Sequence, residues 1–147
     1  MRAYRPHVWP DPVERVAAFL RASGTEGRIE AVLPDSEPPP GLALTAGTFQ
    51  CAGGRTVVAL VPEGRVLDRE KLAKAGACQE LRDAAGSSAF PFQGADVFLD
   101  QSALAAQTVW LELEAPRHFL GLAPAQIVRL TRSKTADLLT EDRIGGG

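Results

Sequence analysis

The side chains that most often bind metals are few in this sequence and lie far apart. Cys51 and Cys78 form no C-x-x-C pair, and no other cysteine or histidine stands near either one. His7 and His118 are each isolated as well. Because a structural zinc site needs three or four such ligands at short spacing, we expect no metal and no cofactor. We interpret the two cysteines as small apolar residues that stay reduced.

The glycine pair Gly53-Gly54 is the next pattern that could support chemistry. Glycine-rich loops cradle phosphate groups when they lead into a helix, because the first N–H groups of the helix face the anion. Residues 55–61 are instead an almost continuous apolar run, which is typical of a strand. We therefore predict a hairpin turn at the glycine pair and no phosphate site.

The composition and charge exclude several classes of protein. The chain has 147 residues, of which 45% are hydrophobic and 23% charged, with 16 Lys+Arg against 18 Asp+Glu. A formal net charge of -2 argues against a protein that coats nucleic acid by bulk charge. No apolar run approaches the ~18 residues of a membrane span, and we expect neither a signal peptide nor membrane contact. The sequence predicts a soluble cytoplasmic protein with one domain over residues 1–147, including an N-terminal arm at 1–10 and a flexible tail at 140–147.

Capping residues and prolines mark the expected helices, which must hold any site in place. Asp11 stands at the expected N-cap of a first helix, and Gly24 stands where a left-handed residue would end it. Asp68 is expected to cap a second, short helix, and Asp100 to begin a helical turn. Pro124 opens the last helix.

Apolar patterning predicts about seven short strands. Residues 108–114 alternate, with valine and leucine on one face and Trp110 and two glutamates on the other. Successive prolines exclude a helix at 34–41. The expected strands are 28–33, 42–51, 55–61, 77–82, 97–99, 108–114 and 118–122. Because hairpins outnumber crossovers, we expect an α+β fold in which the first and last helices pack against one mixed sheet.

Three blocks of the sequence, taken in order, resemble the YbaK/ProX family of aminoacyl-tRNA editing domains. Residues 65–77 (RVLDREKLAKAGA) are similar to the VDxKKLAKxLGA segment of that family. Residues 91–110 are similar to its PFG…VFVDESLL…TVYV stretch, and residues 120–138 to its LELAPADLVRL…VADI ending. The resemblance covers well over half of the chain and implies a mixed, barrel-like sheet with flanking helices.

The resemblance also implies an activity. Such domains hydrolyse the ester of a mischarged tRNA, either as free-standing proteins or inserted in prolyl-tRNA synthetase, and so maintain the fidelity of translation. A synthetase pocket rejects a smaller amino acid by only ~1–3 kcal/mol per methylene, so a second, hydrolytic site lowers the error. The implied site contains no metal. A lysine on the second core strand and a glycine-rich GxxxP loop hold the terminal adenosine and the ester carbonyl, and a water molecule helped by a ribose hydroxyl attacks.

This sequence departs from the family pattern at that site. The position of the family lysine falls near Ala46, and no lysine precedes Lys71. The loop that ends at Pro91 has Ser87 where the first glycine of GxxxP belongs. Residues 38–40 are prolines where the family has a helix that walls the pocket, and a second wall helix is also shortened. We therefore expect a wider pocket with an apolar floor and no cation near the ester carbonyl.

Several residues near the matching segments are candidates to take over the lost role. Each also has a plainer interpretation: loop serines and surface basic residues are often only solvated, and aromatic residues under a loop often only fill the core. An aromatic side chain can also stack on a terminal adenine. The candidate catalytic residues are Ser87, Ser88 and His118, beside the lost lysine position at Ala46. The candidate substrate-binding residues are Phe90, Pro91, Phe92, Arg55, Arg65 and Lys71.

Two functions remain open from the sequence. The first is a divergent deacylase that acts in trans on a mischarged tRNA, with the tRNA 3′ end as ligand and an aminoacyl-tRNA synthetase as a further partner. The second is a module that kept the fold but lost the chemistry, and that binds a tRNA end, a nucleotide or a protein. Removal of one preorganised donor to an oxyanion lowers a rate by ~10²–10³, so the missing lysine predicts slow hydrolysis. The nearest basic cluster for tRNA contact is Arg55, Arg65, Lys71 and Lys74.

Overall fold

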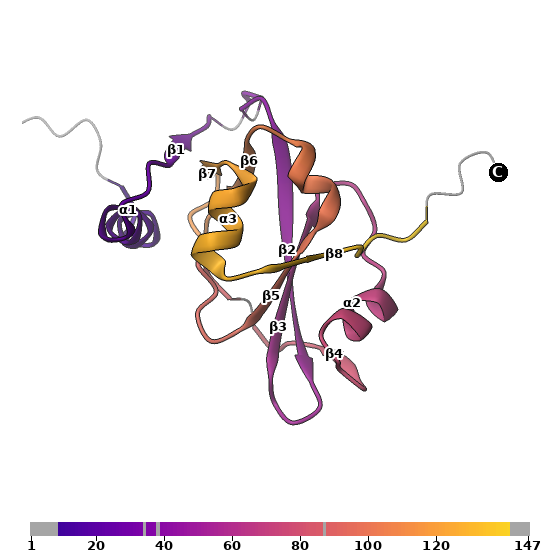
Figure 1. Ribbon diagram of the computed structural model, residues 1–147. Coiled ribbons are helices and arrows are strands. Elements are labelled where there is room, and N and C mark those ends of the chain that lie inside the picture. The colour runs from indigo at the N-terminus through magenta and orange to yellow at the C-terminus, as the bar shows by residue number, and fades with distance from the viewer. Residues whose placement is uncertain (1–8, 34, 38, 87, 142–147) are drawn as a thin grey trace, which may run out of the picture.

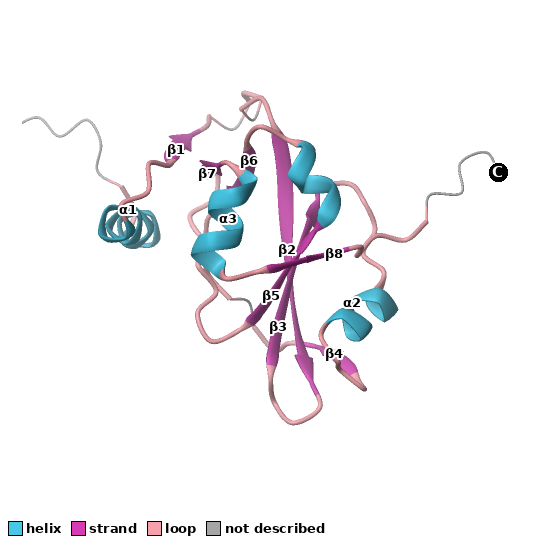
Figure 2. Cartoon of the chain, in the orientation of Figure 1, coloured by secondary structure: helices cyan, strands magenta, loops and turns pink. Residues whose placement is uncertain are grey.

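The computed structural model describes residues 9–33, 35–37, 39–86 and 88–141, and within them it shows one eight-stranded sheet with helices around it (Figures 1 and 2). The helices are α1 (Asp11–Ser23), α2 (Arg69–Ala75), the 3-10 helix η1 (Gln101–Ala105) and α3 (Pro124–Thr131). The strands are β1 (Arg28–Ala31), β2 (Leu42–Cys51), β3 (Thr56–Pro62), β4 (Leu81–Asp83), β5 (Asp96–Asp100), β6 (Val109–Glu112), β7 (His118–Leu122) and β8 (Lys134–Ala136). His7 and most of the expected N-terminal arm and C-terminal tail lie outside the described residues.

The sheet confirms the predicted mixed α+β architecture. Its strands follow the order β1-β7-β6-β2-β3-β5-β8, and β4 pairs with β2. The pairs β2–β6, β3–β5 and β5–β8 are parallel, and the other pairs are antiparallel. The apolar run at 56–61 and the alternating segment at 108–114 therefore lie in one sheet, as predicted. Three strands are shorter than expected, since β1 ends at Ala31, β4 covers only Leu81–Asp83 and β6 only Val109–Glu112.

The hairpin of β2 and β3 runs through the middle of the molecule and separates two apolar cores (Figure 1). Leu44, Val58 and Leu60 point to one face, where they pack with residues of α1 and α3. Phe49 and Val57 point to the other face, where they pack with Leu72 of α2 and with Leu138. We call these the α1 face and the α2 face. The first and last helices thus pack on the same face of the sheet.

The capping residues described next agree with the prediction from the sequence, except at the start of α1. The Asp68 side chain accepts hydrogen bonds from the backbone N–H groups of Glu70 and Lys71 and so caps α2, as predicted. Gly24 adopts a φ of 70° and ends α1. The predicted N-cap of α1 is wrong, because the helix already includes Asp11. Its N-cap is Pro10, which has no side-chain oxygen to offer.

Trp110 of β6 is buried, with only 2% of its surface exposed. Its Nε1–H donates to the carbonyl of Pro40 at 2.8 Å, and its ring covers Gly121, where an added Cβ would lie 2.5 Å from the indole. The proline-rich connection before β2 therefore packs on this strand, and within its described residues it contains no helix.

The interpretation of the cysteines as reduced residues is wrong in this structure. Cys51, at the end of β2, and Cys78, after α2, form a disulfide with Cα atoms 5.6 Å apart. No local pattern indicates this bond, because the two cysteines lie 27 positions apart and meet only through the fold. The bond lies in the apolar core of the α2 face.

No helix within the described residues is long and apolar enough to cross a bilayer.

Candidate active-site cavity

A cavity of about 460 Å³ opens on the α1 face of the sheet. Its walls come from the start of α1, the proline-rich connection, the first half of β2, the loop at 88–92, and the β6–β7 hairpin. Apolar side chains form its deepest part, and charged side chains stand at its edge. The lining residues are Pro12, Arg15, Val16, Pro39, Ala43, Leu44, Thr45, Ala46, Thr48, Glu63, Ser88, Ala89, Phe90, Phe92, Trp110, Leu111, Glu112, Leu113, Glu114, Arg117 and Phe119.

Ala46 lies on the β2 wall of this cavity, at the position that the resemblance gives to the family lysine. It pairs with Leu60 of β3, and Thr48 pairs with Val58 two residues further on. Side chains two apart on a strand point to the same face, so Ala46 and Thr48 lie side by side on the β2 wall of the cavity. No lysine lies among the described residues that line the cavity.

The loop at 88–92 forms another part of the cavity wall and is held to β2 by Thr48. The Ser88 N–H donates to Thr48 Oγ1 at 3.4 Å, and the Ala84 N–H donates to the Thr48 carbonyl at 3.3 Å. Phe90 and Phe92 line the cavity and also belong to the core, with exposed fractions of 8% and 4%. Their burial agrees with the interpretation of these rings as core residues, and the stacking of a base on them stays a prediction.

The charged groups at the edge of the cavity are mostly acidic and mostly unpaired. Three carboxylates, those of Glu63, Glu112 and Glu114, stand against the guanidinium groups of Arg15 and Arg117. Among the described residues, the side chains of Arg15, Glu63 and Glu114 make no hydrogen bond or ion pair. Glu112 accepts a hydrogen bond from the backbone N–H of Arg117 at 2.7 Å. The cavity lining therefore carries one more acidic side chain than basic side chains.

Arg117 fixes the proline-rich wall of the cavity. Its backbone adopts a φ of 63°, and its guanidinium donates to the carbonyls of Leu33 at 2.8 Å and Ser36 at 2.7 Å. The backbone bond from Val32 to the Arg117 carbonyl, at 2.8 Å, adds a third link. One arginine of the β6–β7 turn therefore holds the segment that stands where the family has a helix.

The structure brings only some of the sequence-predicted site residues together. Ala46, Ser88, Phe90 and Phe92 line the cavity. Pro91 belongs to the same loop, where it follows a cis peptide bond, but it is not a lining residue. Ser87 lies outside the described residues.

The other predicted residues lie away from the cavity. His118 is half-buried beside the Trp9 ring, with Nδ1 at 3.0 Å from the Pro116 carbonyl. Arg55 donates to Asp96 at 2.6 Å and lines a second cavity of about 380 Å³. Arg65 is exposed in the turn after β3.

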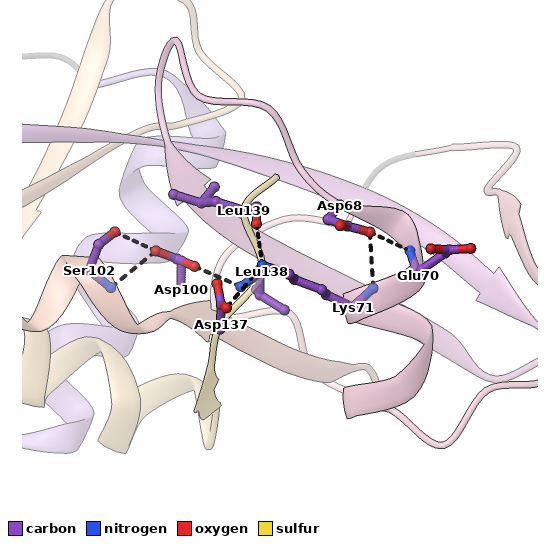
Figure 3. A network of polar contacts seen from close by, with 8 residues as sticks. All are labelled: Asp68, Glu70, Lys71, Asp100, Ser102, Asp137, Leu138 and Leu139. Carbon is purple, nitrogen blue, oxygen red and sulfur yellow. Dashed lines mark hydrogen bonds and ion pairs between the residues drawn. The ribbon is translucent and has the colours of Figure 1, made fainter. Parts of the chain in front are cut away.

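Lys71 is held on the α2 face by two partners (Figure 3). Its Nζ donates to Asp137 at 2.9 Å and to the Leu139 carbonyl at 2.7 Å. The hydrogen bond from Lys71 lowers the pKa of the Asp137 carboxyl, and the same bond raises the pKa of the Lys71 ammonium. This lysine joins α2 to the C-terminal segment and does not reach the cavity.

Sequence reasoning missed Thr48, Arg117 and the acidic edge. The strand period placed Thr48 on the same face as Ala46, so its position could have been found from the sequence. The role of Arg117 depends on a contact with residues more than 80 positions earlier, at 2.8 Å from the Leu33 carbonyl, and no local pattern encodes it. Within the described residues, no group of three or more histidine, cysteine, aspartate or glutamate side chains could hold a metal ion.

Comparison with known proteins shows the fold. No family model matches the chain, and no curated protein matches it in sequence. The structure of a candidate trans-editing enzyme for prolyl-tRNA synthetase superposes with a TM-score of 0.77, over 91% of this chain and 100% of that one, at 18% identity. A hypothetical protein superposes with a TM-score of 0.73 at 13% identity, over 86% of this chain and 99% of that one.

A third structure, a candidate signal transduction protein from Marinobacter aquaeolei VT8, has a TM-score of 0.70 at 19% identity. The match covers 91% of this chain and 31% of that one. The expected mixed YbaK/ProX-like α+β fold with flanking helices is thereby confirmed.

Proposed function

We propose that this protein is a trans-acting deacylase that hydrolyses the ester of a mischarged tRNA in the cavity on the α1 face. One observation carries the proposal. Ala46, the loop from Ser88 to Phe92 and the β6 wall are far apart in the sequence, yet they meet around a single cavity of about 460 Å³. The editing-enzyme fold of the neighbour described above supports the same assignment.

The cavity has the features that an aminoacyl ester requires. Leu44, Phe90 and Leu111 give an apolar interior for a small side chain, and such an interior discriminates mainly by size. The carboxylates of Glu63 and Glu114 are available to the α-ammonium group of the amino acid. The terminal adenosine would lie against the rings of Phe90 and Phe92, where a base can stack.

The reaction proceeds without the family lysine and is therefore slow. A water molecule adds to the ester carbonyl, and the ribose hydroxyl beside the ester helps to orient it. With an alanine at position 46, no ammonium group meets the developing oxyanion, and loss of one such donor lowers a rate by ~10²–10³. Ser88 is a candidate for one of the remaining hydrogen bonds to the substrate.

The proposed partners follow from the substrate. The tRNA 3′ end is the ligand, an aminoacyl-tRNA synthetase is a further partner, and the cytoplasm is the place of action. For the body of the tRNA, Arg65 and Lys74 are better contacts than Arg55 and Lys71. The latter two already have ion-pair partners in Asp96 and Asp137.

One observation favours the alternative of a binding module without hydrolysis. The cavity has the rings of Phe90 and Phe92 in its wall, but no lysine lies among its described lining residues. In that case the protein binds a tRNA end or a nucleotide in the same cavity and releases it unchanged.

A deacylation panel separates the two functions. The wild-type protein is incubated with a set of misacylated tRNAs, beside a lysine-bearing relative, and we expect measurable turnover of at least one at a rate ~10²-fold lower than that relative gives. Ala46→Lys should raise this rate, whereas Gln50→Lys, which adds a lysine to the same strand outside the cavity, should not. Folding of both variants is checked first, so that each rate is that of folded protein.

Binding of tRNA without turnover by the wild-type protein or Ala46→Lys would establish the module instead. Equal gains from Ala46→Lys and Gln50→Lys would show that the cavity is not the site.

A further inference from the structure

Thr48 is the nearest polar side chain to Ala46 on the same face of β2. The two residues pair with Val58 and Leu60 of β3, and both line the cavity. Residues two apart on a strand are separated by about 6.8 Å along it, so both side chains meet the same part of the floor. Thr48 therefore brings a hydroxyl group to the region of the cavity that a lysine at position 46 would serve.

The hydrogen bonds of Thr48 leave its proton available. A threonine hydroxyl can donate one hydrogen bond and accept two. Thr48 Oγ1 accepts from the Ser88 N–H at 3.4 Å and, among the described residues, donates to none. The bond from Ser88 uses only an acceptor site of Thr48 Oγ1. The hydroxyl proton is therefore free to point to a ligand.

The placement of Thr48 distinguishes it from the other hydroxyls of the cavity. Thr45 pairs with Val61, so its side chain starts from the opposite face of the strand. Ser88 lies in a loop, whereas Thr48 lies in a strand that pairs with β3 from Leu44 to Gln50. Donors that stabilise a transition state work best on rigid elements, because the geometry is then set before the reaction begins.

We propose that the Thr48 hydroxyl donates a hydrogen bond to the carbonyl oxygen of the aminoacyl ester during hydrolysis. This inference rests on the proposed function. The water oxygen adds to the carbonyl carbon, and the π pair moves to the carbonyl oxygen, which accepts from Thr48 Oγ1–H. When the intermediate collapses, the C–O bond to ribose breaks, the ribose oxygen takes the proton that the water lost, and the amino acid leaves. Thr48 keeps its own proton throughout.

The test compares three variants on the misacylated tRNA that the wild-type protein deacylates fastest. Thr48→Val removes the hydroxyl at nearly constant volume, and Thr48→Ser retains it. Thr56→Val makes the same chemical change at the start of β3, outside the cavity. We expect Thr48→Val to lower kcat by ~10², with KM unchanged, because the bond forms only as the oxyanion develops. Thr48→Ser should keep most of the rate, and Thr56→Val should leave it unchanged.

The outcomes separate this inference from the function on which it rests. A wild-type protein that hydrolyses no member of the panel contradicts the proposed function, and the inference falls with it. A wild-type protein that is active, with Thr48→Val equally active, overturns the inference alone. A rise in KM with constant kcat for Thr48→Val also overturns it, because Thr48 would then only support the loop through its bond to Ser88. A loss that Thr48→Ser shares overturns it as well, because serine keeps the hydroxyl and the effect would then come from the lost methyl group. Thermal unfolding of each variant confirms that the rates are those of folded protein.

Discussion

The two faces of the sheet use their polar side chains in opposite ways. On the α2 face they bond to one another (Figure 3). Asp100 is only 1% exposed, and its two carboxylate oxygens accept from the Leu138 N–H at 2.8 Å and the Ser102 N–H at 3.0 Å. Lys71 joins α2 to Asp137, and the Cys51–Cys78 disulfide lies on the same face.

On the α1 face the polar groups of the cavity are left largely unbonded. Arg15, Glu63 and Glu114 have no side-chain partner among the described residues, and Thr48 accepts a bond without giving one. Polar groups that the fold has already bonded stabilise it, whereas those without partners are available to a ligand. The comparison assigns stability to the α2 face, and under the proposed function it leaves the α1 face for the chemistry.

The disulfide should give the largest effect on stability. Cys51→Ser with Cys78→Ser removes a cross-link between residues 27 apart, and the entropy of the unfolded chain then lowers the free energy of unfolding by ~3.5 kcal/mol. Urea unfolding without reductant measures this, and thiol titration of the wild-type protein controls for the bond. Deacylation by the folded double variant should persist. A double variant that is folded but inactive would contradict the assignment of different roles to the two faces.

Asp100→Ala should give the next largest effect. It leaves the buried Leu138 N–H without a partner and removes the cap of η1, so we expect a loss of ~2–3 kcal/mol. Asp100→Asn, which keeps one acceptor oxygen, should lose less. Equal stability of Asp100→Ala and the wild-type protein would show that the network does not hold the C-terminal segment.

Arg117→Ala should affect binding more than stability. It removes the guanidinium bonds to the Leu33 and Ser36 carbonyls, which are partly exposed, so we expect a loss of ~1 kcal/mol. The proline-rich wall loses its anchor, and KM for the misacylated tRNA should rise by about tenfold, which corresponds to 1.4 kcal/mol. Steady-state kinetics and urea unfolding of the same preparation compare the two effects. An unchanged KM would show that the proline-rich segment does not contribute to substrate binding.

The Lys71–Asp137 pair should give the smallest effect, and it should depend on pH. The pKa of Asp137 is lowered by its bond to Lys71, so the pair stabilises the fold above the unfolded-state pKa of aspartate and loses this effect as pH falls below about 4. The raised pKa of Lys71 predicts a matching loss as pH rises above about 10. Thermal unfolding of Asp137→Asn and the wild-type protein should differ slightly at neutral pH and converge in acid. A constant difference from pH 3 to 7 would contradict the assignment.

Much of the fold could be predicted from the sequence because it is encoded locally. The Asp68 cap, the Gly24 stop and the apolar run of β3 each depend on a few adjacent residues. The disulfide and the burial of Trp110 could not, since both need partners from other strands, such as Gly121 beside the indole.

The same distinction applies to the site. Ala46 and Phe90 were found through the resemblance, and both line the cavity. Arg55 and His118 were chosen for their chemistry and their nearness in sequence, yet the fold gives them other neighbours, Asp96 and Trp9. Nearness along the chain does not decide which face of a sheet a side chain reaches.

The position of a bound substrate analogue tests the central claim most directly. A crystal structure is determined with a non-hydrolysable amide analogue of an aminoacyl-adenosine. The account predicts that the aminoacyl group lies in the cavity on the α1 face, with its carbonyl oxygen within hydrogen-bond distance of Thr48 Oγ1 and close to Ala46 Cβ. An analogue seated on the α2 face, or no binding at saturating concentration, would contradict it.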